Sequence, residues 1–204
     1  MKNYFKILLA SVVILTFSFK TKEPKVINVV IDVSHGGTDF GSTNSNVNEK
    51  TIVASISKKI ELLNSDNNVK INLTRIGDYE LSLKERVEII NHIKPDLVLS
   101  LHINANKNEK ANGYDVFISD KSNTYLKSNE LAEKFATSFS DKTKLIYRGI
   151  KTSPLFILKN SDCPALHLEL GFITNDFDRN YVSSENGQTE IAQSILTFVS
   201  SLKE

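Results

Sequence analysis

Apolar and polar positions follow two different periods along the chain, and these periods predict strands and helices. Residues 26–33 form a run of mostly β-branched apolar residues, which is typical of a strand buried on both faces. Residues 49–63 instead place Ile52, Ile56 and Ile60 at helical spacing. The same patterns predict further strands over 69–74, 97–103, 113–118 and 165–170, and further helices over 83–93, 128–139 and 188–202.

The order of these elements predicts the fold class. Strands alternate with helices, which indicates an α/β fold with a mostly parallel twisted sheet and helices on both faces. Residues 36–48 are rich in Gly, Ser, Thr and Asn and predict a loop after the first strand. Because the sequence has no internal repeat or low-complexity tract, we expect a single domain over residues 26–204.

The N-terminal residues have the pattern of an export signal. Lys2 and Lys6 accompany an apolar run from Ile7 to Phe19, which is shorter than the roughly 20 residues that a membrane span needs. We therefore predict a signal peptide over residues 1–20, with an uncleaved N-terminal anchor in contact with the membrane as the alternative, and a polar linker over 21–25. Both place the domain in the periplasm or cell envelope.

Charge and cysteine content argue against nucleic-acid binding and against chemistry based on a disulfide or a reactive cysteine. The formal charge is +1, and the first twenty residues hold three lysines and no acidic residue, which leaves −2 for the rest of the chain. This is no basic surface for nucleic acid, so we expect no nucleic-acid partner. Cys163 is the only cysteine, so an internal disulfide is impossible, and neighbouring Asp162 and Pro164 offer no cation to activate the thiol.

Three residues at the ends of predicted elements can bind a metal. His35 follows the first strand, Glu49 starts the helix after the Gly-rich loop, and His102 ends a buried strand. We expect them to meet at the carboxyl edge of the sheet, and two imidazoles with one carboxylate form an open zinc site. Each has an ordinary alternative: a loop histidine, a helix first-turn acid, and a strand histidine bonded to a backbone carbonyl.

Glu169 lies in an apolar strand, where a carboxylate is costly unless it is paired or functional. One explanation is a salt bridge to Arg75, Arg86 or Arg148. The other is a general base that takes a proton from a zinc-activated water. Arg75 and Arg86 themselves are interpreted as members of structural ion pairs rather than as substrate clamps.

Two further residues are candidates by their spacing. His167 precedes Glu169 by two positions, and Asn104 follows His102 by two, so each pair would face one way along a strand. We therefore expect Asn104 to be able to donate to a substrate carbonyl. His167 is a candidate contact of Glu169 or of the substrate.

The motifs together resemble the zinc-dependent N-acetylmuramoyl-L-alanine amidase family, whose catalytic domain is often called amidase type 3. The resemblance departs at Val33 and Ser34, where the family usually has Pro-Gly, and at His167, where it usually has an apolar residue. The matching residues, in order, are 30–39, Gly41, 48–50, 73–75, Arg86, Asn91, 99–105, Gly113, 148–151 and 164–175.

The resemblance implies the roles of the site residues. His35, Glu49 and His102 would bind one Zn²⁺, and Glu169 would be the catalytic acid and base. The substrate would be peptidoglycan, cleaved between N-acetylmuramic acid and L-alanine in wall remodelling or daughter-cell separation. Some members carry an inserted helix that blocks the zinc, and the short connection before residues 128–139 predicts none here. No activator protein can be named.

Two rival functions remain at this point. Another zinc amidohydrolase of peptidoglycan, such as a stem-peptide peptidase or a deacetylase, would share the ligands and release a different product. A wall-binding module without catalysis is the second rival, and the intact Glu169 argues against it.

Overall fold

The structure is a computed structural model that describes residues 25–44 and 46–203. The predicted signal segment, residues 1–20, and residues 21–24 of the predicted linker lie outside the described residues. Within the described part, no helix is long and apolar enough to cross a bilayer.

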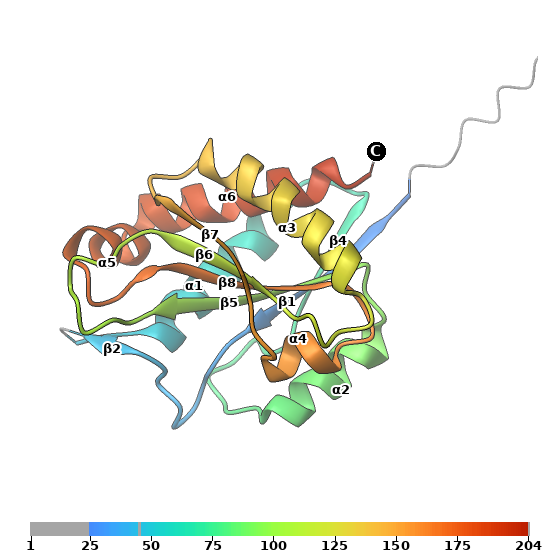
Figure 1. The fold of residues 1–204 in the computed structure, drawn as a ribbon, viewed down its shortest axis with the longest axis horizontal. Helices are drawn as coiled ribbons and strands as arrows, with labels where there is room; N and C mark the ends of the chain where they lie inside the picture. Colours follow the sequence, from blue (N-terminus) through green and yellow to red (C-terminus); the bar gives the residue numbers. More distant parts are fainter. Residues whose placement is uncertain (1–24, 45, 204) are drawn as a thin grey trace, which may run out of the picture.

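One six-stranded sheet forms the centre of the molecule, and a short two-stranded sheet lies beside it (Figure 1). The strands are β1 (Ile27–Val33), β2 (Thr43–Asn44), β3 (Val47–Asn48), β4 (Val69–Leu73), β5 (Leu97–Asn104), β6 (Tyr114–Ile118), β7 (Tyr147–Thr152) and β8 (Ala165–Phe172). The large sheet has the order β4-β1-β5-β8-β6-β7, in which only the β6–β8 pair is antiparallel. The mostly parallel sheet that the sequence predicts is therefore confirmed.

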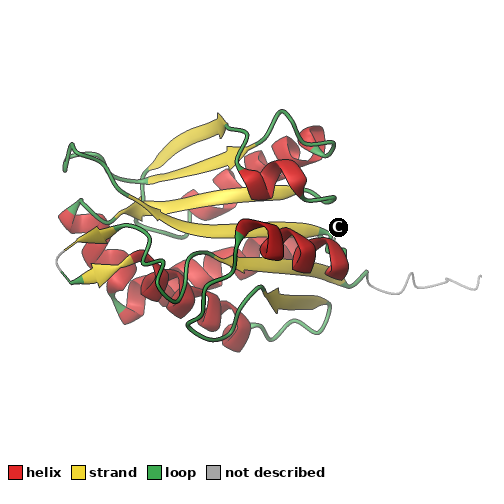
Figure 2. Ribbon diagram, turned by 90° about the horizontal axis from the view of Figure 1, so that it is seen from below, coloured by secondary structure: helices red, strands yellow, loops and turns green. Residues whose placement is uncertain are grey.

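Helices cover both faces of the sheet, as Figure 2 shows. Alternation along β5 separates the faces, because Leu99 and Leu101 pack in the larger core cluster and Val98 packs in the smaller one. The larger cluster lies under α1 (Glu49–Leu63), α3 (Tyr125–Ser140), α5 (Asp176–Ser183) and α6 (Glu185–Ser201); the smaller lies under α2 (Leu83–Ile93) and α4 (Phe156–Asn160).

Local sequence fixes where the helices next to the site begin. The side chain of Asn48 accepts a hydrogen bond from the N–H of the third helical residue, which makes Glu49 the first residue of α1. Ser82 and Glu85 form a reciprocal capping box at the start of α2, and this helix ends two residues before Pro95. The N-terminal position that the sequence predicts for Glu49 is thus present in the structure.

Several elements differ from the sequence predictions. The helix expected over 128–139 begins at Tyr125, and the helix expected over 188–202 spans 185–201. The strand β7 and the short helices α4 and α5 were not predicted, and the loop over 36–48 contains the β2–β3 pair. Residues 119–124 join β6 to α3 without a helix between them, as the short connection predicts.

A buried polar network lies beneath the first loop. Asp32 Oδ1 accepts hydrogen bonds from Thr74 Oγ1 at 2.9 Å and Arg86 Nη1 at 2.8 Å, and Asp32 Oδ2 accepts one from Ser100 Oγ at 2.7 Å. Burial alone would raise the pKa of Asp32, but the Arg86 charge and these hydrogen bonds hold that pKa below its usual value. The carboxylate is therefore ionised, and Arg86 forms the structural ion pair that the sequence predicts.

We expect Asp32→Ala to lower the free energy of unfolding of the zinc-free protein by about 3–5 kcal/mol, because the charge of Arg86 would remain buried without a partner. Urea unfolding measures this change. Lys84→Ala, on the same helix as Arg86, is the control, since it removes only an exposed pair with Glu88 at 3.6 Å. Equal losses in the two variants would contradict this role of Asp32.

Candidate active site

Three side chains converge at the carboxyl edge of the sheet. His35 follows β1, Glu49 begins α1, and His102 lies near the end of β5. The Nε2 atom of His35 and the Nδ1 atom of His102 each lie 3.0 Å from Glu49 Oε1. One donor atom from each residue lies within 4.8 Å of the others, so the structure brings together the three residues that the sequence suggests as ligands.

Backbone N–H groups hold Glu49 in place. The N–H of Ser42 donates to Oε2 at 2.8 Å, and the N–H of Ile103 donates to Oε1 at 3.0 Å. Burial alone would raise the pKa of Glu49, but its hydrogen bonds with His102 and His35 hold that pKa far below its usual range. Glu49 is therefore an ionised, fixed carboxylate.

The backbone of His35 lies in the left-handed region, with φ = +56°. Its carbonyl accepts hydrogen bonds from Arg75 Nε at 2.8 Å and Arg86 Nη2 at 2.7 Å. Its Nδ1 atom bonds Asp39 Oδ2 at 2.7 Å, which leaves Nε2 facing Glu49. Burial lowers the pKa of His35, but Glu49 and Asp39 more than offset this and raise it above the usual value.

The backbone at Gly41 passes close to the donor atoms, and both this close approach and the donor set fit a bound metal ion. At Gly41, where φ is +63°, an added Cβ would lie 2.6 Å from Glu49 Oε2 and 2.8 Å from His35 Nε2. Only glycine can pass the donors at this distance. Two imidazoles and a carboxylate are also the donor set of open zinc sites.

Glu169 and His167 lie beside this group, on β8. Glu169 is the register partner of His102 across β5–β8, and His167 Nε2 lies 2.9 Å from Glu169 Oε1. The ring of His167 stacks on that of His102, with centroids 4.1 Å apart and an interplanar angle of 20°. The expectation that His167 and Glu169 face the same way therefore agrees with the structure.

None of the three arginines considered as partners of Glu169 pairs with it. Arg86 pairs with Asp32, Arg148 Nε bonds Asp115 Oδ2 at 3.1 Å, and Arg75 donates to backbone carbonyls. The salt-bridge explanation of Glu169 is therefore wrong, and so is the interpretation of Arg75 as a member of an ion pair.

Asn104 keeps the alternation of β5: His102 and Asn104 are half-buried, and Ile103 between them packs in the larger core cluster. The β5–β8 register shifts beside it, because the two steps from His102 to Asn104 face three steps from Glu169 to Phe172, so the extra residue of this bulge lies in β8. The side-chain oxygen of Asn104 accepts a hydrogen bond from the N–H of Ala105 at 2.8 Å. A bulge of this kind cannot be read from hydrophobic periodicity.

Sequence reasoning missed two carboxylates. Asp39 orients His35, and the only signal for it was its place four residues later in the Gly-rich loop. Asp115 is fully buried in β6 as the register partner of Glu169, and the argument applied to Glu169 would have found it. Cys163 is buried, which raises the pKa of its thiol to about 12 and agrees with a structural role.

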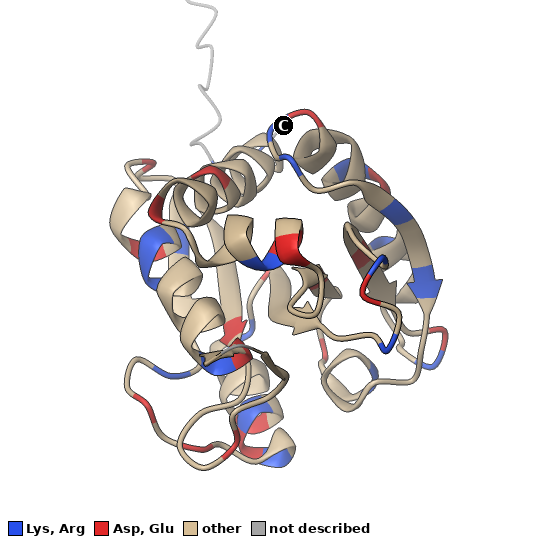
Figure 3. Cartoon of the chain, turned by 90° about the vertical axis from the view of Figure 1, so that its left-hand side faces the viewer, with Lys and Arg blue, Asp and Glu red and all other residues tan. Residues whose placement is uncertain are grey.

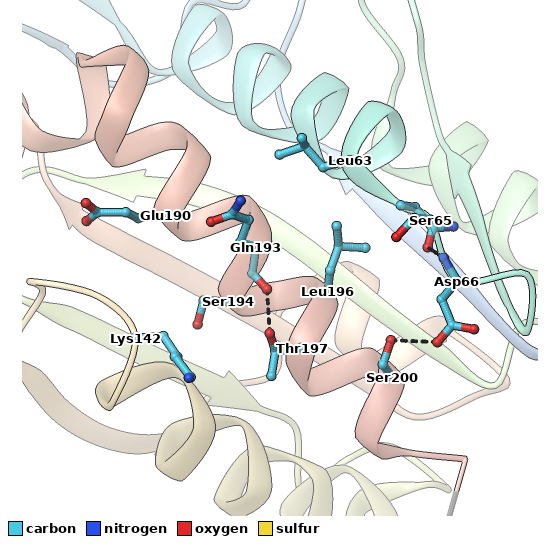
Figure 4. A pocket seen from close by; sticks show the side chains of 11 residues that line it. Leu63, Ser65, Asp66, Lys142, Glu190, Gln193, Ser194, Leu196, Thr197 and Ser200 are labelled. Atoms are coloured by element: carbon cyan, nitrogen blue, oxygen red, sulfur yellow. Dashed lines mark hydrogen bonds between the residues drawn. The ribbon is translucent and has the colours of Figure 1, made fainter.

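A cleft lies at the three-residue site, and a larger cavity lies elsewhere on the molecule. A cleft of about 220 Å³ is lined by His35 and His102 together with Leu81 and Ile157. A larger cavity of about 590 Å³ lies near Leu63, at the opposite end of α1 from Glu49 and about 20 Å along that helix (Figure 4).

In the view of Figure 3, acidic and basic residues are interspersed over the molecule.

Residues 29–201 match the family described as N-acetylmuramoyl-L-alanine amidase. The chain belongs to the N-acetylmuramoyl-L-alanine amidase family. The family assignment, the enzyme class and the α/β fold predicted from the sequence are thereby confirmed. Zinc dependence is general in this family of hydrolases.

Individual relatives and solved structures agree with this assignment. The N-acetylmuramoyl-L-alanine amidase LytC of Bacillus subtilis is 30% identical over 82% of this chain, which spans only 34% of LytC. The amidase structure from Clostridium difficile 630 is 30% identical, with a TM-score of 0.81 over 87% of this chain and 96% of that one. The catalytic domain of CwlV from Bacillus (Paenibacillus) polymyxa is 27% identical, with a TM-score of 0.80 over 86% of this chain and 97% of that one.

We expect Asp39→Ala to weaken zinc binding about 10- to 100-fold, because His35 loses the partner that fixes its orientation. Competition with a chromophoric chelator measures this affinity. Asp120→Ala, which removes a half-exposed carboxylate after β6, is the control and should bind zinc as the unchanged protein does. Unchanged affinity in Asp39→Ala would exclude this role.

Gly41→Ala should weaken zinc binding and also lower the free energy of unfolding by about 1–2 kcal/mol, the cost of a left-handed backbone with a Cβ. Gly149→Ala is the matched control, because Gly149 also has positive φ but an added Cβ would meet nothing within 4 Å. Chelator competition and urea unfolding separate the two effects. If both variants bind zinc equally well, the close approach at Gly41 does not shape the site.

Proposed function

We propose that this chain hydrolyses the amide bond between N-acetylmuramic acid and L-alanine in peptidoglycan, with one zinc ion bound by His35, Glu49 and His102. The observation that carries the proposal is the convergence of these donors, with Glu169 as the register partner of His102. Membership of the amidase family supports the choice of bond.

Zinc, when bound, supplies a Lewis acid that lowers the pKa of water toward ~7 and polarises a carbonyl oxygen. Glu169 accepts a proton from the water whose oxygen attacks the lactyl carbonyl carbon. The same carboxyl group gives this proton to the alanine nitrogen as the carbon–nitrogen bond breaks. The products are a lactyl carboxylate and a stem peptide with a free amino group on L-alanine.

Asn104 is proposed to help orient the substrate. The N–H of Ala105 occupies the side-chain oxygen of Asn104, so the NH₂ group is the end that can donate to a carbonyl oxygen. His35 is held by Asp39 and by the two guanidinium groups at its carbonyl, so its Nε2 atom needs no reorientation.

We further propose that the enzyme is exported and acts in cell-wall remodelling or daughter-cell separation. Residues 1–20 would be the signal peptide or N-terminal anchor, residues 21–25 a linker, and residues 26–204 the catalytic domain. The apolar run that follows Lys6 supports the signal, and peptidoglycan as substrate requires a location in the cell envelope.

The test is digestion of purified peptidoglycan by the zinc-loaded protein, with products identified by mass spectrometry. We expect stem peptides with a free L-alanine amino terminus, and a loss of turnover of about 10²-fold or more in Glu169→Ala with zinc still bound. Lys70→Ala, on the edge strand β4, is the control and should retain activity.

Products other than free L-alanyl stem peptides would indicate one of the rival functions. Cuts inside the stem peptide would indicate a peptidase, and released acetate would indicate a deacetylase with the same zinc site. A folded, zinc-loaded protein that binds peptidoglycan without releasing a product would contradict the amidase proposal and favour a binding module.

A further inference from the structure

We propose that His167 is a positioning residue for the general base: its Nε2–H donates to Glu169 Oε1 and holds the carboxylate with Oε2 as the oxygen that exchanges the proton. This inference rests on the amidase function proposed above and adds to it a role for a position outside the zinc ligands. It also explains a residue at which this chain departs from the apolar residue usual in the motif that it resembles.

The first support is the unequal environment of the two carboxylate oxygens. His167 Nε2 lies 2.9 Å from Glu169 Oε1. Oε2 of Glu169 is buried and has no hydrogen-bond partner among the described residues. Such an oxygen costs free energy unless it is used, and a reacting proton would use it.

The second support is that packing fixes the imidazole ring that makes this bond. One face of His167 stacks on His102, 4.1 Å between centroids, and Phe117 meets the ring edge-to-face at 5.7 Å and 87°. Phe117 and His167 are register partners across β6–β8, so the strands themselves set this contact. The His167 side chain is only 12% exposed, which leaves little room for another rotamer.

The third support is the contrast between Glu169 and Glu49. Both oxygens of Glu49 accept backbone N–H groups, at Ser42 and Ile103, which suits a permanent ligand. Among the described residues, Glu169 has a single donor, His167, at one of its two oxygens. A carboxylate held on one side only keeps its orientation, while its other oxygen retains a lone pair that no protein donor occupies.

Two substitutions separate the hydrogen bond from the packing. His167→Leu keeps an apolar side chain between Phe117 and His102 but removes the donor. His167→Gln loses the ring but places an amide NH₂ close to the position of Nε2. His167→Asn is the matched control, because its shorter side chain cannot reach Glu169 in the same way.

The experiment measures kcat and KM of the zinc-loaded full chain on soluble muropeptides. We expect His167→Leu and His167→Asn to lower kcat about 10- to 100-fold with little change in KM, because the base is misplaced and substrate binding is not. His167→Gln should recover kcat to within about threefold of the unchanged protein. Zinc affinity and the melting temperature should be similar in all variants.

A second readout does not depend on activity. Long-range ¹H–¹⁵N NMR spectra of the zinc-free protein report which ring nitrogen of His167 is protonated. We expect a protonated Nε2, with its signal shifted in Glu169→Ala but unshifted in Lys70→Ala. A His167 protonated only at Nδ1 would overturn the proposal, since Nε2 could not donate.

The kinetic outcomes are equally decisive. Full kcat in His167→Leu would show that the base needs no such donor, and failure of Gln to recover kcat at unchanged zinc affinity would assign the effect to the ring contact with His102. Either result overturns the positioning role while leaving the amidase proposal intact. If the unchanged protein releases no L-alanyl stem peptide, the proposed function fails first, and the NMR result still decides whether the hydrogen bond exists.

Discussion

The site depends on one constraint, the fixing of the chain as it leaves β1. Two cationic side chains, Arg75 and Arg86, donate to the carbonyl oxygens of residues 33–35, and Asp32 balances the charge of Arg86. These bonds satisfy backbone groups that the left-handed turn at His35 removes from the sheet. With the backbone held there, Asp39 turns the His35 imidazole so that its Nε2 atom faces Glu49.

The carboxyl edge of the sheet then assembles the rest. β1, β5 and β8 are adjacent and parallel, so the residues that follow or end them arrive together. α1 begins at this edge with a capped N-terminus and places Glu49 between the two histidines. Glu169, the proposed general base, comes from β8, which lies on the other side of β5 from β1. Each group thus comes from a different element, and the sheet register sets their spacing.

The sequence predicted the elements whose apolar residues recur at a clear helical or strand spacing. The bounds of α1 and α2 agree with the helical spacing, and the shared edge of His35, Glu49 and His102 follows from strand and helix order. β7 was missed because it is an edge strand with mostly exposed residues and no apolar alternation. The bulge in β8 after Glu169 and the pairing of Asp39 with His35 depend on tertiary contacts that no local pattern encodes.

The central claim is that the three donors form one metal site next to Glu169. Anomalous diffraction at the zinc edge, from crystals of the zinc-loaded protein, tests it directly. The account predicts a single strong peak in contact with His35 Nε2, His102 Nδ1 and the Glu49 carboxylate, with the His167–Glu169 hydrogen bond still present. A peak at other residues, or the three donors apart in a folded zinc-loaded protein, would contradict it.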